Sequence, residues 1–260
     1  MIPGAFEYHR PSSVSAAIGL LADLGGEARV VAGGHSLIPM MKLRMALPEH
    51  LVDLRDIDGL SGVSEEGGDL VIGAMTTQAE LIASQRLSQK CPILGEASLL
   101  IADPQVRYCG TIGGNVANGD PGNDMPAIMQ ALDAKFVLEG ANGSREVAAR
   151  GFYEAAYETA RQDDEILTSI RIPTPASGHG HAYEKQKRKV GDYATAAAAV
   201  ILAMDGTQCR AASIALTNVG DTPLYAEAAS NALVGTPVDD AAIVSAAAEA
   251  EAITDPASDG

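Results

Sequence analysis

The amino-acid sequence predicts an α+β fold of three successive parts, each a sheet with helices. Three patterns support this prediction. Short apolar strands joined through a helix come first, strands spaced as antiparallel hairpins follow, and long alternating strands with alanine-rich helices end the chain. We therefore expect two domains, 1–177 and 178–260, the first divided into a βαβ part (1–55) and an antiparallel part (56–177).

The composition is typical of a globular protein, and the charge limits the kinds of partner that the chain can bind. It has 260 residues, 47% of them hydrophobic and 20% charged, which is enough for a sizeable core. The formal net charge of −16 disfavours nucleic acid and anionic membranes as partners, because both bind positive surfaces.

Cysteine usage and hydropathy predict a cytoplasmic protein. Cys91, Cys109 and Cys209 have no C-x-x-C spacing, so they supply neither an iron–sulfur cluster nor a disulfide framework. The N-terminus has no basic-then-apolar leader pattern. The longest apolar run, 194–204, is far shorter than the roughly 20 residues of a membrane span, so we do not expect an integral membrane protein.

The first part predicts one amphipathic helix and a βαβ unit. Apolar residues at helical spacing from Ala17 to Leu24 define the helix, which Ser12 or Ser13 caps and which Gly25 and Gly26 end. The other expected elements are a strand at 28–31, a helix with Pro39 near its first turn and a strand at 50–54.

The middle part predicts antiparallel strands with interspersed helices. A strand at 69–77 leads into a capping box made by Thr77 and Glu80. The stretch 107–127 is rich in Gly and Asp, and we expect it to be a long connection. The other expected elements are a helix at 92–100, a hairpin of 135–138 with 145–148, and a strand at 165–173.

The last part follows a linker at 173–181 that is rich in Pro, Gly and His. Asp205-Gly206 marks a sharp hairpin. The expected elements are strands at 182–189, 194–204 and 209–216 and helices near 224–233 and 239–252.

Two glycine doublets are the strongest candidates for a ligand site. The turn Ala32-Gly33-Gly34-His35-Ser36 between a strand and a helix can expose backbone N–H groups to a phosphate. It lacks the Gly-x-Gly-x-x-Gly and Gly-Lys-Ser/Thr patterns, so alone it fits an ordinary strand–turn–helix better than a phosphate site. A second doublet in TIGGN (111–115) allows a pyrophosphate to be gripped from two sides. Charge-assisted hydrogen bonds of about 1.5–3 kcal/mol each then favour a dinucleotide cofactor.

Three further positions have two interpretations each. Asp124 is either the N-cap of a helix or a carboxylate that accepts from a ligand hydroxyl. The cations from Lys185 to Lys189 form a solvated strand face or a ligand contact. Tyr193 is either a core residue or a ring that stacks on a flat ligand.

The sequence shows no machinery for acting on an organic substrate. It has no Ser-His-Asp order, no H-E-x-x-H motif and no dense histidine cluster. We expect His35 to be a turn or cap residue and Cys109 to be a buried thiol.

The two doublets, AGGHS at 32–36 and TIGGN at 111–115, together resemble the FAD-binding medium subunit of the molybdenum hydroxylases, the xanthine dehydrogenase family. The resemblance covers essentially the whole chain. The stretches 101–127 and 183–200 look closest to the carbon monoxide dehydrogenase members of that family.

The resemblance implies an FAD-binding domain in two parts and a C-terminal domain with a three-stranded antiparallel sheet. Family members usually continue into a helix with a Tyr-Arg pair, so we expect the C-terminal domain to lack its last helix here. No catalytic or metal-ligating residue is implied. The implied cofactor-binding residues are Ala32, Gly33, Gly34, His35, Ser36, Leu37, Thr111, Gly113, Gly114 and Asn115 in the pyrophosphate loops, Asp124 at the ribityl chain, Leu167 and Lys185 near the isoalloxazine, and Asp192 and Tyr193 at the ring face.

The resemblance also implies a function and partners. The chain would be the FAD-carrying electron-transfer subunit of an oxidoreductase, most similar to aerobic carbon monoxide dehydrogenase. There a large subunit with the molybdenum cofactor converts CO and water to CO₂. Electrons then pass through [2Fe–2S] clusters of a small subunit to FAD and an external acceptor. The implied assembly is a dimer of heterotrimers in the cytoplasm, loosely associated with the inner face of the membrane through the acceptor.

Three alternatives remain at this stage. One is the flavoprotein subunit of a molybdenum hydroxylase for a purine, an aldehyde or an N-heterocycle. Another is a stand-alone FAD-dependent reductase of the enolpyruvyl-glucosamine type, whose acid and serine we do not find in the sequence. The last is an assembly subunit without FAD, against which the intact glycine doublets argue.

Overall fold

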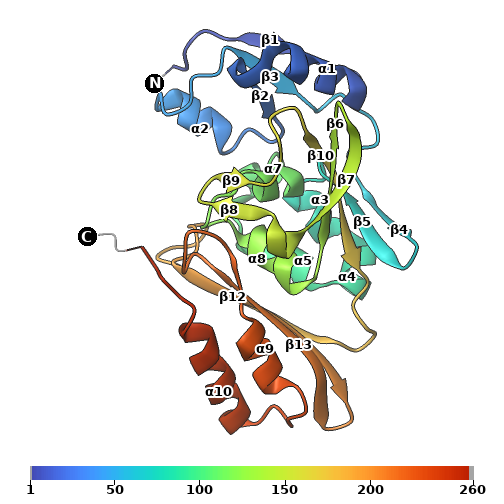
Figure 1. Cartoon of the computed structure of the whole chain (residues 1–260), viewed down its shortest axis with the longest axis vertical. Helices are drawn as coiled ribbons and strands as arrows, with labels where there is room; N and C mark the ends of the chain where they lie inside the picture. The colour runs from blue at the N-terminus through green and yellow to red at the C-terminus, as the bar shows by residue number, and fades with distance from the viewer. Residues whose placement is uncertain (1, 258–260) are drawn as a thin grey trace.

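The computed structural model of the chain describes residues 2–257 and confirms the α+β class. Three sheets follow one another along the long axis of the molecule, in the order of the sequence (Figure 1). A short two-stranded ribbon lies beside the middle sheet. Among the described residues, no helix is both long and apolar enough to cross a membrane.

The first sheet is parallel and has the strand order β1-β3-β2. Its two faces are covered differently, because Ala28 and Val52 pack toward the first helix while Val31 and Leu51 pack toward the second. The edge strand β1 was not predicted, since its three residues give too short a pattern. The elements of this part are β1 (Glu7–His9), α1 (Val14–Leu24), η1 (Gly25–Glu27), β2 (Ala28–Val31), α2 (Leu37–Lys42) and β3 (His50–Asp53).

The middle sheet is antiparallel and has the order β4-β5-β10-β6-β7. The predicted hairpin and the predicted strand at 165–173 are confirmed as neighbours in it, and the capping box of Thr77 and Glu80 is present. The strands are β4 (Val63–Glu66), β5 (Asp69–Gly73), β6 (Lys135–Gly140), β7 (Gly143–Ala148) and β10 (Ile166–Pro173), with the ribbon of β8 (Tyr153–Ala155) and β9 (Glu158–Thr159) after η2 (Ala149–Gly151).

The expected long connection at 107–127 is wrong, because the chain there forms short helices. Thr111 caps the helix of residues 112–117 by accepting from the Gly114 amide, and Asp103 caps the preceding helix of residues 104–107 by accepting from the Val106 amide. Tertiary packing overrides the poor helix propensity of the glycines. The helices of the middle part are α3 (Gln78–Ala83), α4 (Gln85–Lys90), α5 (Ile93–Leu100), α6 (Pro104–Arg107), α7 (Ile112–Ala117) and α8 (Asp124–Ala131).

Helix α8 is the centre of the molecule, and every one of its eight residues is buried. One side of it packs in the core of the middle sheet, and the other side packs on the C-terminal sheet. A single hydrophobic cluster therefore runs from Leu70 in the middle part to Ala215 in the last part. The Gln130 side chain adds a buried hydrogen bond to the Pro223 carbonyl at 3.1 Å.

The C-terminal sheet is antiparallel and lies between helices. The helices α8 and α9 lie on opposite faces of this sheet (Figure 1). Along β12, Ala197 and Ala199 belong to the core cluster that includes α8, whereas Ala198 and Val200 pack against the cluster of the outer helices. Small residues suit a strand with helices close on both faces. A two-residue strand, at the start of the helix expected near 224–233, adds a fourth strand to the expected three. The elements are β11 (Gly180–Gln186), β12 (Ala196–Asp205), β13 (Gln208–Thr217), β14 (Leu224–Tyr225), α9 (Glu227–Leu233) and α10 (Asp240–Glu251).

The structure selects between the two serines that could cap α1, which gives a first prediction. The Ser13 hydroxyl accepts from the Ala16 amide at 3.1 Å. We expect Ser13→Ala to lower the free energy of unfolding by about 1 kcal/mol, because the amide loses its capping partner. Urea denaturation measures this change. The neighbouring Ser12→Ala is the matched control and should leave stability unchanged; equal losses would contradict the assignment of the cap.

Candidate functional site

A cleft of about 570 Å³ lies where the three parts of the chain meet. Its size falls in the roughly 300–1,000 Å³ range of small-molecule and cofactor sites. The first part supplies the loop after β2, the middle part supplies α7 and the start of α8, and the last part supplies the end of β11 and the loop after it. All fifteen cofactor-binding residues expected from the sequence line this one cleft.

The first glycine loop presents unpaired donors. Gly34 has φ = +75°, a left-handed conformation that favours glycine, and it turns the chain from β2 into α2. Within residues 2–257, nothing accepts a hydrogen bond from the five consecutive backbone N–H groups of 33–37. Successive free amides in such a turn form an anion-binding concavity. The chain here is suited to a phosphate.

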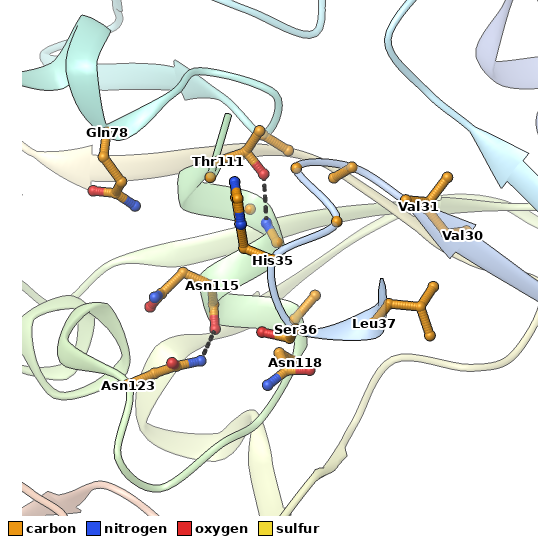
Figure 2. A pocket seen from close by; sticks show the side chains of 18 of the residues that line it. Val30, Val31, His35, Ser36, Leu37, Gln78, Thr111, Asn115, Asn118 and Asn123 are labelled. Atoms are coloured by element: carbon orange, nitrogen blue, oxygen red, sulfur yellow. Dashed lines mark hydrogen bonds between the residues drawn. The ribbon is translucent and has the colours of Figure 1, made fainter. Parts of the chain in front are cut away.

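The glycines of the two loops also allow backbone to pack against backbone. A Cβ on Gly33 would lie 2.3 Å from the Cys109 carbonyl oxygen, and one on Gly113 would lie 2.5 Å from the Ala74 Cβ. A Cβ on Gly114 would lie 2.8 Å from the Thr111 Oγ1. Figure 2 shows the first loop running alongside α7, the helix that Thr111 caps. The doublets therefore bring the two walls of the cleft together, in addition to any contact with a ligand.

The second loop differs from the first because its amides are already bonded. The N–H groups of Ile112 and Gly113 donate to the carbonyls of Thr76 and Ala74 at 2.9 Å each, and those of Gly114 and Asn115 donate to Thr111. Polar side chains are left to face the cleft. Thr111 keeps its hydroxyl proton, and Asn115 accepts from the Met125 amide through Oδ1, so its amino group stays free within the described part of the chain.

Two more asparagines extend this polar wall (Figure 2). The Asn123 side chain donates to the Asn115 carbonyl at 2.9 Å and so fixes the loop before α8. The buried Nδ2 of Asn118 has no partner among the described residues. A buried donor without a partner is costly unless a ligand or water supplies an acceptor. Its place in the cleft wall favours a ligand acceptor.

Asp124 is held in a buried network rather than at a helix cap. Asn123 occupies the cap position and Asp124 is the first residue of α8, so the cap interpretation is wrong. The Tyr183 hydroxyl donates to one oxygen of Asp124 at 2.5 Å, and Lys185 Nζ donates to the other at 2.9 Å. The side chains of Lys185 and Asp124 are only 1% and 6% exposed. Burial raises the pKa of the Asp124 carboxyl, while Lys185 and Tyr183 offset part of that rise.

The cations that follow Lys185 fit the solvated-face interpretation. Arg188 and Lys189 are exposed, and Arg188 Nε lies 3.4 Å from Asp192 Oδ2. Tyr193 is 56% exposed and stands against Gly122, so it is not a core residue. A half-exposed ring at the mouth of the cleft can lie over a flat ligand.

Sequence reasoning missed several residues of the site. Tyr183 could have been found, because it is two residues before Lys185 in a strand and therefore lies on the same face. Asn118 is one helical turn after Asn115, but the prediction of a connection at 107–127 places neither residue on a helix. Arg161, which also lines the cleft, lies in an irregular segment that gives no periodic signal.

Two expectations about reactive residues have different outcomes. Cys109 is exposed, so the expected buried thiol is wrong; it follows a short helix and only its backbone packs against the first loop. His35 lies in the turn before α2, and its side chain makes no hydrogen bond within residues 2–257. Neither residue has a partner that would activate it as a nucleophile or base.

Comparison with known proteins gives two family matches that together span nearly the whole chain. Residues 4–175 match the FAD binding domain in molybdopterin dehydrogenase, and residues 181–260 match the CO dehydrogenase flavoprotein C-terminal domain. The chain is 65% identical to the carbon monoxide dehydrogenase medium chain of Afipia carboxidovorans and 51% identical to that of Hydrogenophaga pseudoflava, over 100% of its own length and 90% of theirs. The structure also resembles a chain of reconstituted CO dehydrogenase from Oligotropha carboxidovorans, with a TM-score of 0.99, 65% identity and coverage of 100% and 91%.

The buried ion pair gives the second prediction. We expect Lys185→Met to lower the free energy of unfolding by about 3–5 kcal/mol, because it leaves the Asp124 carboxylate buried without its cation. Urea denaturation measures the loss. Lys189→Met removes a charge from an exposed position nearby and should change stability by less than about 0.5 kcal/mol. Similar small effects of both substitutions would show that the pair does not hold this part of the site.

Proposed function

Since the chain belongs to the family of FAD binding domains in molybdopterin dehydrogenases, we propose that it is the FAD-carrying subunit of a carbon monoxide dehydrogenase. The family match makes it an FAD-binding chain of an oxidoreductase. The two relatives named carbon monoxide dehydrogenase medium chain, at 65% and 51% identity, support the choice of enzyme within the family.

One observation carries the site assignment. Five consecutive free backbone amides, at 33–37, belong to the lining of a cleft to which all three parts of the chain contribute. The donors fit the phosphate groups of FAD, and the orphan amide of Asn118 fits a further acceptor. The chemistry of these residues therefore agrees with the cofactor that the family binds.

We assign the cofactor-binding residues as follows. The backbone of Ala32–Leu37 holds the pyrophosphate, and Thr111, Gly113, Gly114 and Asn115 form the facing wall, with donors from side chains. Asp124 accepts from the ribityl hydroxyls. Leu167 and Lys185 lie toward the isoalloxazine, and Asp192 and Tyr193 lie at its face. Tyr183 positions Asp124 through the 2.5 Å hydrogen bond.

The protein's part in the chemistry is to bind, orient and shield. FAD, when bound, supplies redox chemistry that no side chain of this chain offers. Lys185 and Asp124 form a buried ion pair at the polar edge of the cleft, which holds both side chains in fixed positions there. Tyr193 covers one side of the cleft mouth.

The proposed assembly follows the subunit names of the relatives. The three cysteines are free, and two are buried singly, so this chain has no thiolate set for clusters among its described residues. We therefore place the molybdenum cofactor on a large subunit and the [2Fe–2S] clusters on a small one, in a dimer of heterotrimers. In this assembly the chain would hold the FAD that accepts the electrons of CO oxidation, for transfer to an external acceptor at the cytoplasmic face of the membrane. The domains that we propose remain 1–177 and 178–260, with a division of the first near residue 55.

Flavin binding by the purified chain tests the site assignment. We expect about one FAD per chain, seen as the two visible absorption bands of oxidised flavin. Gly114→Val should weaken FAD retention at least tenfold, because its side chain displaces the Thr111 hydroxyl and meets Ala32, whose Cβ is 3.6 Å from the added Cβ. Gly151→Val, where an added Cβ meets open space, is the matched control. Full retention by Gly114→Val would contradict the placement of the second loop.

Isolation of the chain from its native cells tests the proposed assembly separately. An affinity-tagged chain should bring down two other subunits, one with molybdenum and one with iron, in equal amounts. Metal analysis and CO-dependent dye reduction of the isolated complex measure this. Recovery of a flavin-containing chain alone would favour a stand-alone reductase and contradict the assembly, while leaving the FAD site intact.

A further inference from the structure

Outside the cleft, two histidines and a glutamate gather at the edge of the N-terminal sheet. They are Glu7 and His9 on β1 and His50 at the start of β3, and β1 lies beside β3 at the end of the molecule farthest from α10 (Figure 1). Nothing in the flavin site uses them. Each offers one ligand atom, and the three atoms lie within 4.8 Å of one another.

The register of the parallel sheet brings these side chains to one face. Glu7 is aligned with His50, and aligned residues of neighbouring strands point the same way. His9 is two residues after Glu7, so it lies on that face too. All three positions are set by backbone pairing, not by a mobile loop.

The distances match those between ligands of one small cation. His9 Nε2 and His50 Nδ1 are 3.1 Å apart, and His50 Nδ1 is 3.6 Å from Glu7 Oε2. Two ligand atoms bound to tetrahedral zinc at 2.0–2.1 Å lie about 3.3 Å apart. A cation between the two rings would accept a lone pair from each nitrogen. A direct hydrogen bond between the two nitrogens uses the lone pair of only one of them.

The surrounding charge also favours a cation. Carboxylate oxygens of Glu27 and Glu49 lie within 4.8 Å of each other and of a ring nitrogen of His50. No Lys or Arg of residues 2–257 forms a salt bridge with Glu7, Glu27 or Glu49. Three carboxylates without a protein cation leave a local negative charge.

We propose that Glu7, His9 and His50 form a zinc-binding site that joins β1 to β3. Imidazole nitrogen with one carboxylate suits zinc better than magnesium or calcium, which prefer all-oxygen sites. The fourth position is open to water. The site would stabilise an edge strand that otherwise has a neighbour on one side only.

Zinc titration of the full chain, freed of metal with a chelator and loaded with FAD, tests this site. Competition with a coloured chelator should give one zinc per chain with a micromolar Kd. His9→Gln and His50→Gln should each weaken binding at least tenfold. His181→Gln is the matched control, because it removes another half-buried histidine that lies 3.1 Å from a glutamate, Glu96; its zinc affinity should equal that of the unaltered chain.

Thermal unfolding provides a second measurement. Zinc should raise the Tm of the unaltered chain and of His181→Gln, but not that of His50→Gln, because only a ligand of the folded state stabilises it. Retained FAD absorption shows that each variant is folded. Absence of micromolar zinc binding by the unaltered chain, or unchanged binding by both His9→Gln and His50→Gln, would overturn the proposal.

Discussion

The contact between Asp124 and Lys185 is the constraint on which the arrangement of the molecule depends. A carboxylate at the start of a fully buried helix is tolerated only with partners, and Asp124 takes both of its partners from β11. The helix belongs to the middle part and the strand to the last part. Their pairing therefore fixes the C-terminal sheet against α8, closes one end of the cleft and makes the core continuous across the expected domain boundary.

The same constraint explains why small residues dominate β12. A sheet that must lie on α8 on one face and on α9 on the other has little room for side chains, and alternate alanines serve both contacts. The glycines in the loops on the opposite wall of the cleft also allow close packing, because they have no side chains. Gly33 and Gly113 admit neighbouring backbone at distances that a Cβ would prevent. Close packing at the glycine loops and along β12 therefore fixes the walls of the cleft in the chain itself.

Most elements of the fold could be predicted from the sequence, because their signals are local. The cap by Ser12 or Ser13, the box of Thr77 and Glu80 and the hairpin turns each depend on residues a few positions apart, and the structure then selects Ser13. The short helix α7 could not, since Gly113 and Gly114 are poor helix formers and its first amides donate to Thr76 and Ala74, which are distant in the sequence. Among the site residues, the glycine loops were visible in the sequence. The roles of Tyr183 and Asn118 depend on which side chains the tertiary fold brings together.

A net charge of −16 and an anionic cofactor are compatible, because binding is decided locally. Charges beyond roughly 8 Å are largely screened at physiological salt. The cleft is lined by five free amides and by Arg29 and Arg161. Its carboxylates each have a cationic partner: Asp124 pairs with Lys185, Glu165 with Arg145 and Asp192 with Arg188. Burial lowers the pKa of Arg161, yet a guanidinium starts so high that it stays protonated. The excess of acidic residues therefore acts on the outer surface, where it keeps nucleic acid away, and leaves the cleft free to hold phosphate.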